Sequence, residues 1–102
     1  MTLNQAKANY KEAVEAAAKE LGDLGPPPYK FVYTVYPSSS RAFDLANVLP
    51  IIQKFTDDAL IELGVISEDN YKIIRSIAYE FGAVDKDNPR AELEIIGVTL
   101  PE

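Results

Sequence analysis

A run of three prolines, Pro26-Pro27-Pro28, constrains the fold of this chain more than any other feature. Each proline removes a backbone donor and disfavours the helical conformation of the residue before it, so no helix passes through residues 22–28. The glycines in the same stretch add a further break. This segment is therefore predicted to be a stiff connector between two separate elements.

The residues before the connector predict a helix. Thr2 and Gln5 have the spacing of a capping box, and Gly22 supplies a stop signal. Between them apolar residues recur at helical spacing, at Leu3, Tyr10, Ala13, Val14, Ala17 and Leu21. We expect an amphipathic helix over residues 3–21.

The residues after the connector predict a strand and then a second helix. Residues 29–36 are rich in β-branched and aromatic side chains, which favours a strand that ends at Pro37. Because Pro50 is tolerated only in the first turn of a helix, the second helix is expected to begin near Ala46 or Asn47 and to end at Gly64. Its apolar stripe consists of Leu45, Val48, Leu49, Ile52, Phe55, Thr56, Ala59, Leu60 and Leu63.

Two alternating segments, residues 71–80 and 90–98, predict two further strands. The turn-rich residues 85–89 separate them, so we expect a hairpin with a long loop. The order of elements predicts an α+β fold in which two helices pack on one face of a small mixed β-sheet. With 102 residues, the chain is expected to form a single domain, residues 1–102, and its small core favours a homodimer.

The composition limits the chemistry that the chain can perform. It has no cysteine and no histidine, so any metal or catalytic chemistry falls to carboxylates, which favours Mg²⁺ or Mn²⁺. The formal net charge of -6 is unusual for a nucleic-acid-binding protein. A long apolar span and a signal peptide are both missing from the sequence, so we expect a cytoplasmic protein without a membrane partner.

Polar residues gather at three places around the second helix. Asn47, Lys54 and Asp58 share one helical face, opposite the apolar stripe. Residues 67–70 form a polar stretch before the next strand, and Asp44 precedes the helix. These patterns are also typical of a solvated helix face and an ordinary turn, and the neighbouring aspartate at position 57 needs no function. If the element ends are adjacent, carboxylates from both can converge on a divalent cation, with Lys54 beside a phosphate.

Residues 44–69 resemble the active-site stretch of the RusA-type Holliday-junction resolvases. The motif of that family runs Asp-Leu-Asp-Asn, a lysine, Asp-Ala-Leu, a glycine, and an Asp-Asp pair before a strand. This chain has, in the same order, Asp44-Leu45-Ala46-Asn47, Lys54, Asp58-Ala59-Leu60, Gly64 and Glu68-Asp69-Asn70. The spacing from Lys54 to Asp69 is that of the family, and the chain is four residues longer between Asn47 and Lys54.

Two positions depart from the family motif within this stretch. Ala46 stands where the family has its second aspartate, and Glu68 replaces the first member of the Asp-Asp pair. The resemblance covers roughly residues 5–98 and places the start of the chain at the first helix of the family. We therefore expect a RusA-like domain that lacks the N-terminal strand of the family.

The resemblance implies an activity and a site. Asp44, Lys54 and Asp69 would be catalytic, while Asp44, Glu68 and Asp69 would bind Mg²⁺ (or Mn²⁺), supported by Asn47 and Asp58. A homodimer would bind branched DNA and resolve four-way junctions by paired nicks, as suits phage or prophage recombination in a bacterial host.

The residues leave two alternatives open. One is a catalytically impaired RusA-like protein that acts as an acidic binding or regulatory module towards a protein partner, as Ala46 and the net charge of -6 suggest. The other is a structural or assembly subunit that has no site.

Overall fold

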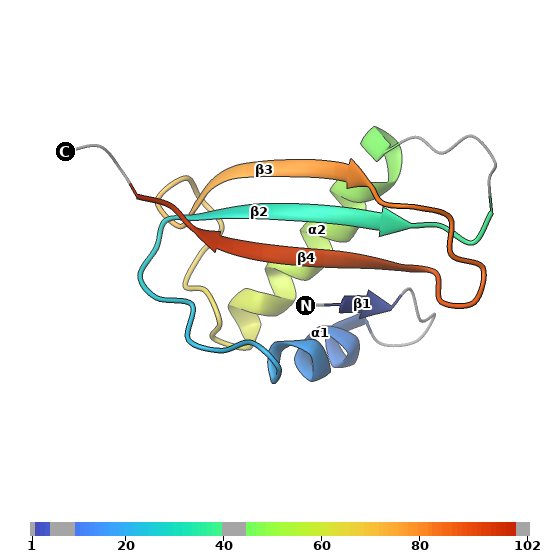
Figure 1. Ribbon diagram of the computed structural model, residues 1–102. Helices are drawn as coiled ribbons and strands as arrows, with labels where there is room; N and C mark the ends of the chain where they lie inside the picture. Colours follow the sequence, from blue (N-terminus) through green and yellow to red (C-terminus); the bar gives the residue numbers. More distant parts are fainter. Residues whose placement is uncertain (1, 5–9, 40–44, 100–102) are drawn as a thin grey trace.

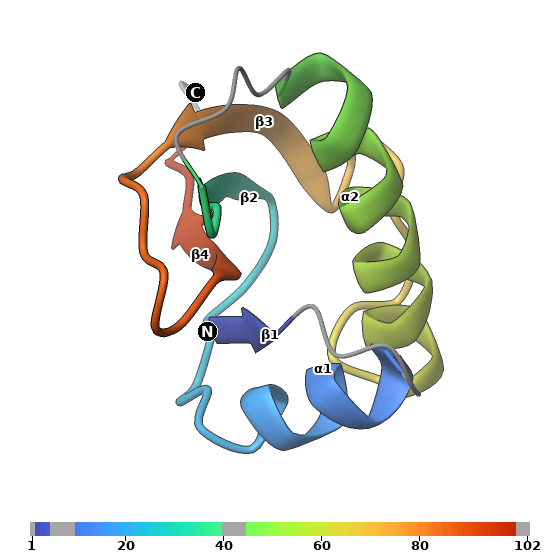
Figure 2. The same ribbon diagram turned by 90° about the vertical axis from the view of Figure 1, so that its right-hand side faces the viewer.

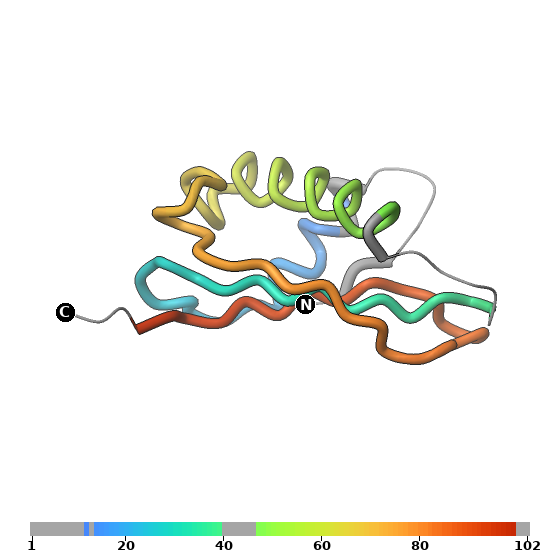
Figure 3. Tube along the Cα trace, turned by 90° about the horizontal axis from the view of Figure 1, so that it is seen from above, coloured from blue at the N-terminus to red at the C-terminus, as the bar shows by residue number. Residues whose placement is uncertain are grey.

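The computed structural model describes residues 2–4, 10–39 and 45–99. Its elements, in chain order, are β1 (Thr2–Asn4), α1 (Tyr10–Ala18), β2 (Tyr29–Tyr36), α2 (Leu45–Glu62), β3 (Ile74–Phe81) and β4 (Arg90–Gly97). The strands form one sheet in the order β1-β4-β2-β3. Both helices lie on one face of this sheet, as Figures 1, 2 and 3 show together, which confirms the predicted α+β arrangement.

Strand β2 occupies the centre of the sheet and matches its predicted range. It pairs in parallel with β3 and antiparallel with β4. Its alternate side chains Tyr29, Phe31, Tyr33 and Val35 are buried, and they face the helices. The connector before it contains Gly25 at a φ of 69°, and the Gly25 carbonyl accepts a hydrogen bond of 2.6 Å from the Tyr29 hydroxyl. This contact fixes the point at which the chain enters the sheet.

Strands β3 and β4 do not pair with each other, so the predicted hairpin is wrong. Strand β2 lies between them, and residues 82–89 cross over its end. The crossing spans two inter-strand spacings, about 10 Å, which this connection covers easily. Alternation along a strand identifies its two faces but not the strands beside it. The most apolar strand takes the central place because it buries the most apolar surface there.

The N-terminal segment also differs from its prediction. Residues Thr2–Asn4 form β1, which pairs antiparallel with β4 and places Leu3 opposite Ala91. A short strand is therefore present where a helix was predicted, and α1 covers Tyr10–Ala18 among the described residues. Pairing with the outer edge of β4 satisfies the backbone hydrogen-bonding groups of this strand. The two strands are far apart in the sequence, and helix propensity depends on neighbouring residues only, so it does not predict this pairing.

Helix α2 packs its apolar stripe on the sheet and against α1. Leu49, Ile52, Ala59 and Leu60 are buried in one core together with Val14 of α1. The helix ends where Gly64 adopts a φ of 77°, as the sequence predicted.

Three details of α2 correct the sequence prediction. The helix begins at Leu45, before the start predicted near Ala46 or Asn47. Pro50 therefore lies in the second turn, where the carbonyl of Ala46 receives no N–H from it. Phe55, which was predicted in the apolar stripe, is 55% exposed.

Leu60→Ala tests how much the α2 contact with the sheet contributes. Leu60 is fully buried, so the truncation is expected to lower the free energy of unfolding by about 2–5 kcal/mol. Ile51→Ala is the matched control, because Ile51 is 58% exposed on the same helix and its truncation is expected to cost below about 1 kcal/mol. Urea unfolding followed by circular dichroism measures both. Equal losses would contradict the assignment of Leu60 to the core.

Candidate functional site

The exposed face of α2 carries the polar residues that the sequence placed there. Asn47, Lys54 and Asp58 are all exposed. The apolar part of the same motif, Ala59 and Leu60, is buried. The helix therefore separates the motif into groups that face the solvent and groups that hold the fold.

Glu68 and Asp69 lie beyond the C-terminal end of α2, whereas Asn47 lies near its N-terminal end. Both side chains are exposed in the turn that leads from α2 to β3, which Figure 1 shows on the far side from the beginning of the helix. An 18-residue helix is about 27 Å long. Within the described residues, the chain does not bring Asn47 close to Glu68 and Asp69. Asp44 lies outside those residues.

A buried polar network links α2 to the sheet through Asp57. The Asp57 side chain is 3% exposed and accepts hydrogen bonds from the Tyr33 hydroxyl at 3.1 Å and from Gln53 Nε2 at 3.4 Å. The Tyr79 hydroxyl in turn donates to Gln53 Oε1. One carboxylate and one amide thus connect the helix to the adjacent strands β2 and β3.

The surroundings of Asp57 raise its pKa to about 6. Burial is the largest cause, because it disfavours the charged form. The hydrogen bonds from Tyr33 and Gln53 act in the opposite direction, and the negative charges of Asp69 and Asp58 raise the pKa further. Asp57 therefore changes charge close to neutral pH and is electrostatically coupled to the turn that carries Asp69.

Sequence reasoning missed this network because its members come from three elements. The i, i+4 spacing of Gln53 and Asp57 was a visible signal, since such pairs meet on one helical face. The position of Asp57 directly after Thr56, a member of the apolar stripe, was another. The opposition of Tyr33 and Tyr79 depends on the pairing of β2 with β3, which the sequence did not predict.

The face of the sheet away from the helices is acidic. Glu80, Glu92 and Glu94 border a hollow of about 350 Å³, floored by Val32, Thr34 and Tyr36. Across residues 2–4, 10–39 and 45–99, no three carboxylates gather closely enough to hold a metal ion. This face therefore presents negative charge without a metal centre.

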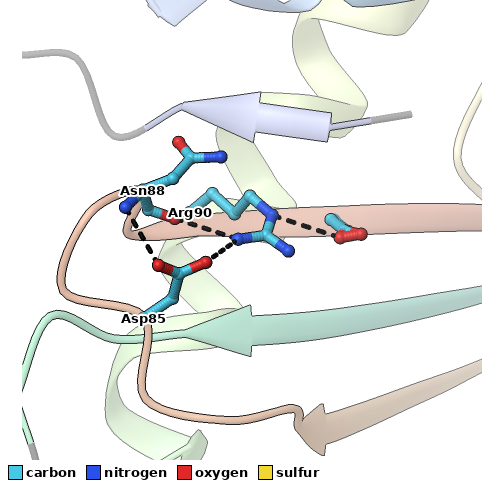
Figure 4. A network of polar contacts seen from close by, with 4 residues as sticks. Asp85, Asn88 and Arg90 are labelled. Carbon is cyan, nitrogen blue, oxygen red and sulfur yellow. Dashed lines mark hydrogen bonds and ion pairs between the residues drawn. The ribbon is translucent and has the colours of Figure 1, made fainter.

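Arg90 lies at the edge of this face. It forms ion pairs with Asp85 at 2.8 Å and with Glu92 at 3.3 Å, and its guanidinium lies 4.0 Å from the centre of the Tyr36 ring. Figure 4 shows Asp85 bridging Arg90 and the backbone of Asn88. The hydrogen bond from Arg90 lowers the pKa of Asp85. Arg90 therefore holds the loop before β4 in place, and its guanidinium is already paired with Asp85 and Glu92.

Comparison of the chain with protein-family models, with curated proteins and with solved structures found no match. Among the described residues, no helix has the length and apolar character that crossing a membrane requires.

Asp57→Asn is expected to stabilise the protein at neutral pH. An acid whose pKa is raised to about 6 in the folded state loses stability as the pH rises through the window between its unfolded value and that value. The variant removes this loss, about 1–3 kcal/mol at pH 7.5. Its Oδ1 still accepts from Tyr33, and reversal of the Gln53 amide restores the second hydrogen bond.

Melting temperatures at pH 5 and pH 7.5 measure the effect. The difference between the two values should shrink in Asp57→Asn and persist in Asp58→Asn, the adjacent exposed carboxylate. An unchanged difference in Asp57→Asn would show that Asp57 does not carry the pH dependence.

Proposed function

We propose that this chain is a Mg²⁺-dependent endonuclease that acts as a homodimer on four-way DNA junctions. The observation that carries the proposal is the ordered motif from Asp44 to Asp69. Its polar and apolar residues lie in different environments, as a binding site requires. Lys54, Asp58, Glu68 and Asp69 are exposed, where substrate can reach them. Ala59 and Leu60 of the motif lie in the core, and Gly64 ends the helix.

The donor set fits a hard cation in kind but is incomplete among the described residues of one chain. Carboxylates are the ligands that Mg²⁺ prefers, and the bound ion would lower the pKa of the attacking water. The described residues of one chain do not assemble a metal centre. Glu68 and Asp69 follow the end of α2, whereas Asp44 precedes its first residue, Leu45, in the sequence. We therefore place the proposed ligands on two subunits of a homodimer.

The distribution of charge favours one side of the molecule for DNA. Glu80, Glu92 and Glu94 on the open sheet face repel phosphates. Lys54 on α2 and Lys72 after the acidic turn are exposed, and each can pair with a phosphate as a point charge. The proposed junction therefore approaches the α2 side of the molecule.

Asp69→Asn tests the activity directly. The wild-type protein should nick a labelled four-way junction only with Mg²⁺, and Asp69→Asn should lose at least about 100-fold of the rate, as removal of a metal ligand does. Glu94→Gln is the matched control, because it removes the same charge from an exposed residue on the open face. Gel electrophoresis of the products measures the rate. Absence of Mg²⁺-dependent nicking by the wild-type protein would contradict the proposal.

A mixture of two inactive variants tests whether the site is shared. If Asp44 of one subunit acts with Asp69 of the other, Asp44→Asn and Asp69→Asn each abolish nicking, whereas a re-equilibrated mixture regains about a quarter of the wild-type rate, because half of the dimers are mixed and each has one intact site. No recovery, with mixed dimers verified by mass spectrometry, would place the whole site in one chain and leave the nuclease activity itself standing.

A second candidate function is an acidic module that binds a protein. The observation in its favour is the open sheet face, where Glu80, Glu92 and Glu94 surround the hollow and suit a basic partner. Binding to junction and duplex DNA at low salt, where attraction to phosphate is strongest, separates the two functions. A protein that binds neither DNA favours this second function.

A further inference from the structure

The outer edge of β3 has no strand partner among the residues that the structure describes. β3 lies at the end of the sheet and pairs only with β2. In Figure 1 its far side faces away from the other strands. An open edge on a strand of eight residues is a template for pairing with another chain.

The pairing with β2 determines which backbone groups point outward. The Gly82 N–H donates to the Val35 carbonyl at 2.9 Å, so Gly82 directs its backbone groups toward β2. This direction alternates along a strand, so Ser76, Ala78 and Glu80, which follow the register shift near the start of β3, do the same. Ile77, Tyr79 and Phe81 therefore direct their N–H and C=O groups to the free edge.

Two exposed apolar side chains border this edge. Ile77 is 42% and Phe81 is 51% exposed. They are in register with the buried residues Phe31 and Val35, so they lie on the side of the sheet that carries the helices. Tyr79 lies midway between them on the same strand. Apolar side chains beside an open strand edge favour association.

We propose that β3 pairs antiparallel with β3 of a second copy, with Tyr79 opposite Tyr79 of the partner subunit on a twofold axis. Ile77 then lies opposite the partner's Phe81 at two symmetric places, so the exposed apolar side chains cover one another. The outward N–H and C=O groups gain partners in the same step. Glu80 faces the partner's Ala78, and no like charges are opposed.

A second copy in this register fits the edge better than the alternatives. A shift of the register by two residues places Phe81 opposite the partner's Arg75, so Phe81 no longer meets the partner's Ile77. Association through the open sheet face would oppose Glu92 and Glu94 to their own copies, which like charges disfavour. The proposal depends on the edge and its side chains, and it stands whether or not the chain cleaves DNA.

Two double variants test both the edge and its register. In I77K/F81K, each introduced lysine meets another lysine across the proposed interface. In I77K/F81E, each introduced lysine meets an introduced glutamate of the other subunit, while the two positions within one chain are too far apart to pair, about 13 Å. Both native side chains are exposed, so each variant should fold. Circular dichroism and melting temperature check this.

Sedimentation equilibrium gives the dimer dissociation constant. We expect a wild-type dimer, weakening by at least about tenfold in I77K/F81K, and a recovery of most of that loss in I77K/F81E. A monomeric wild-type protein overturns the proposal, as does a dimer that I77K/F81K retains. Failure of I77K/F81E to recover overturns the register.

Amide hydrogen exchange of the wild-type protein gives a test that needs no variant. The amides of Ile77, Tyr79 and Phe81 should be protected at high concentration and exchange faster on dilution, while the amide of Gly82, bonded to Val35, should change little. Equal exchange of the outward amides at all concentrations overturns the pairing.

Discussion

The burial of one side of β2 beneath α2 is the interaction on which the rest of the structure depends. Phe31, Tyr33 and Val35 are fully buried, and they meet Leu49 and Leu60 of α2 in a single core. β3 and β4 gain their positions by pairing with this strand and not with each other. A domain of this size has little apolar surface to spare, so the strand that buries every second side chain along its length lies in the middle.

The same contact explains why a carboxylate is retained inside. Asp57 lies on the flank of α2 that faces β2 and β3, and its hydrogen bonds to Tyr33 and Gln53 satisfy it without removing the cost of burying its charge. A leucine there would remove that cost but would leave the Tyr33 hydroxyl without its acceptor. The network thus fixes the helix against two strands at once, and it places a group that responds to the charge of Asp69 beneath the exposed face of the candidate site.

The sequence predicted the positions of helices and strands better than it predicted which strands lie side by side. The range of β2 and the end of α2 at Gly64 follow from local chemistry, namely β-branched residues after prolines and a glycine at positive φ. The pairing of β3 with β2, the short strand β1, and the burial of Asp57 depend on which segments meet in space, and no local pattern encodes that. The candidate site shows the same division. Helical periodicity placed Asn47 on an exposed face, whereas its separation from Glu68 and Asp69 depends on the three-dimensional path of the chain.

Symmetry connects the two proposals. β3 follows α2 through one turn and runs back along it (Figure 1). A twofold axis through Tyr79 would therefore set the two α2 helices antiparallel, with the turn of residues 67–70 of one subunit on the side where α2 of the other begins. The proposed ligands Asp44 and Asp69, which precede and follow α2 in the sequence, would then come together between chains. The edge that leaves Ile77 and Phe81 exposed is then the edge whose pairing can complete a site, and the dimer would serve chemistry as well as stability.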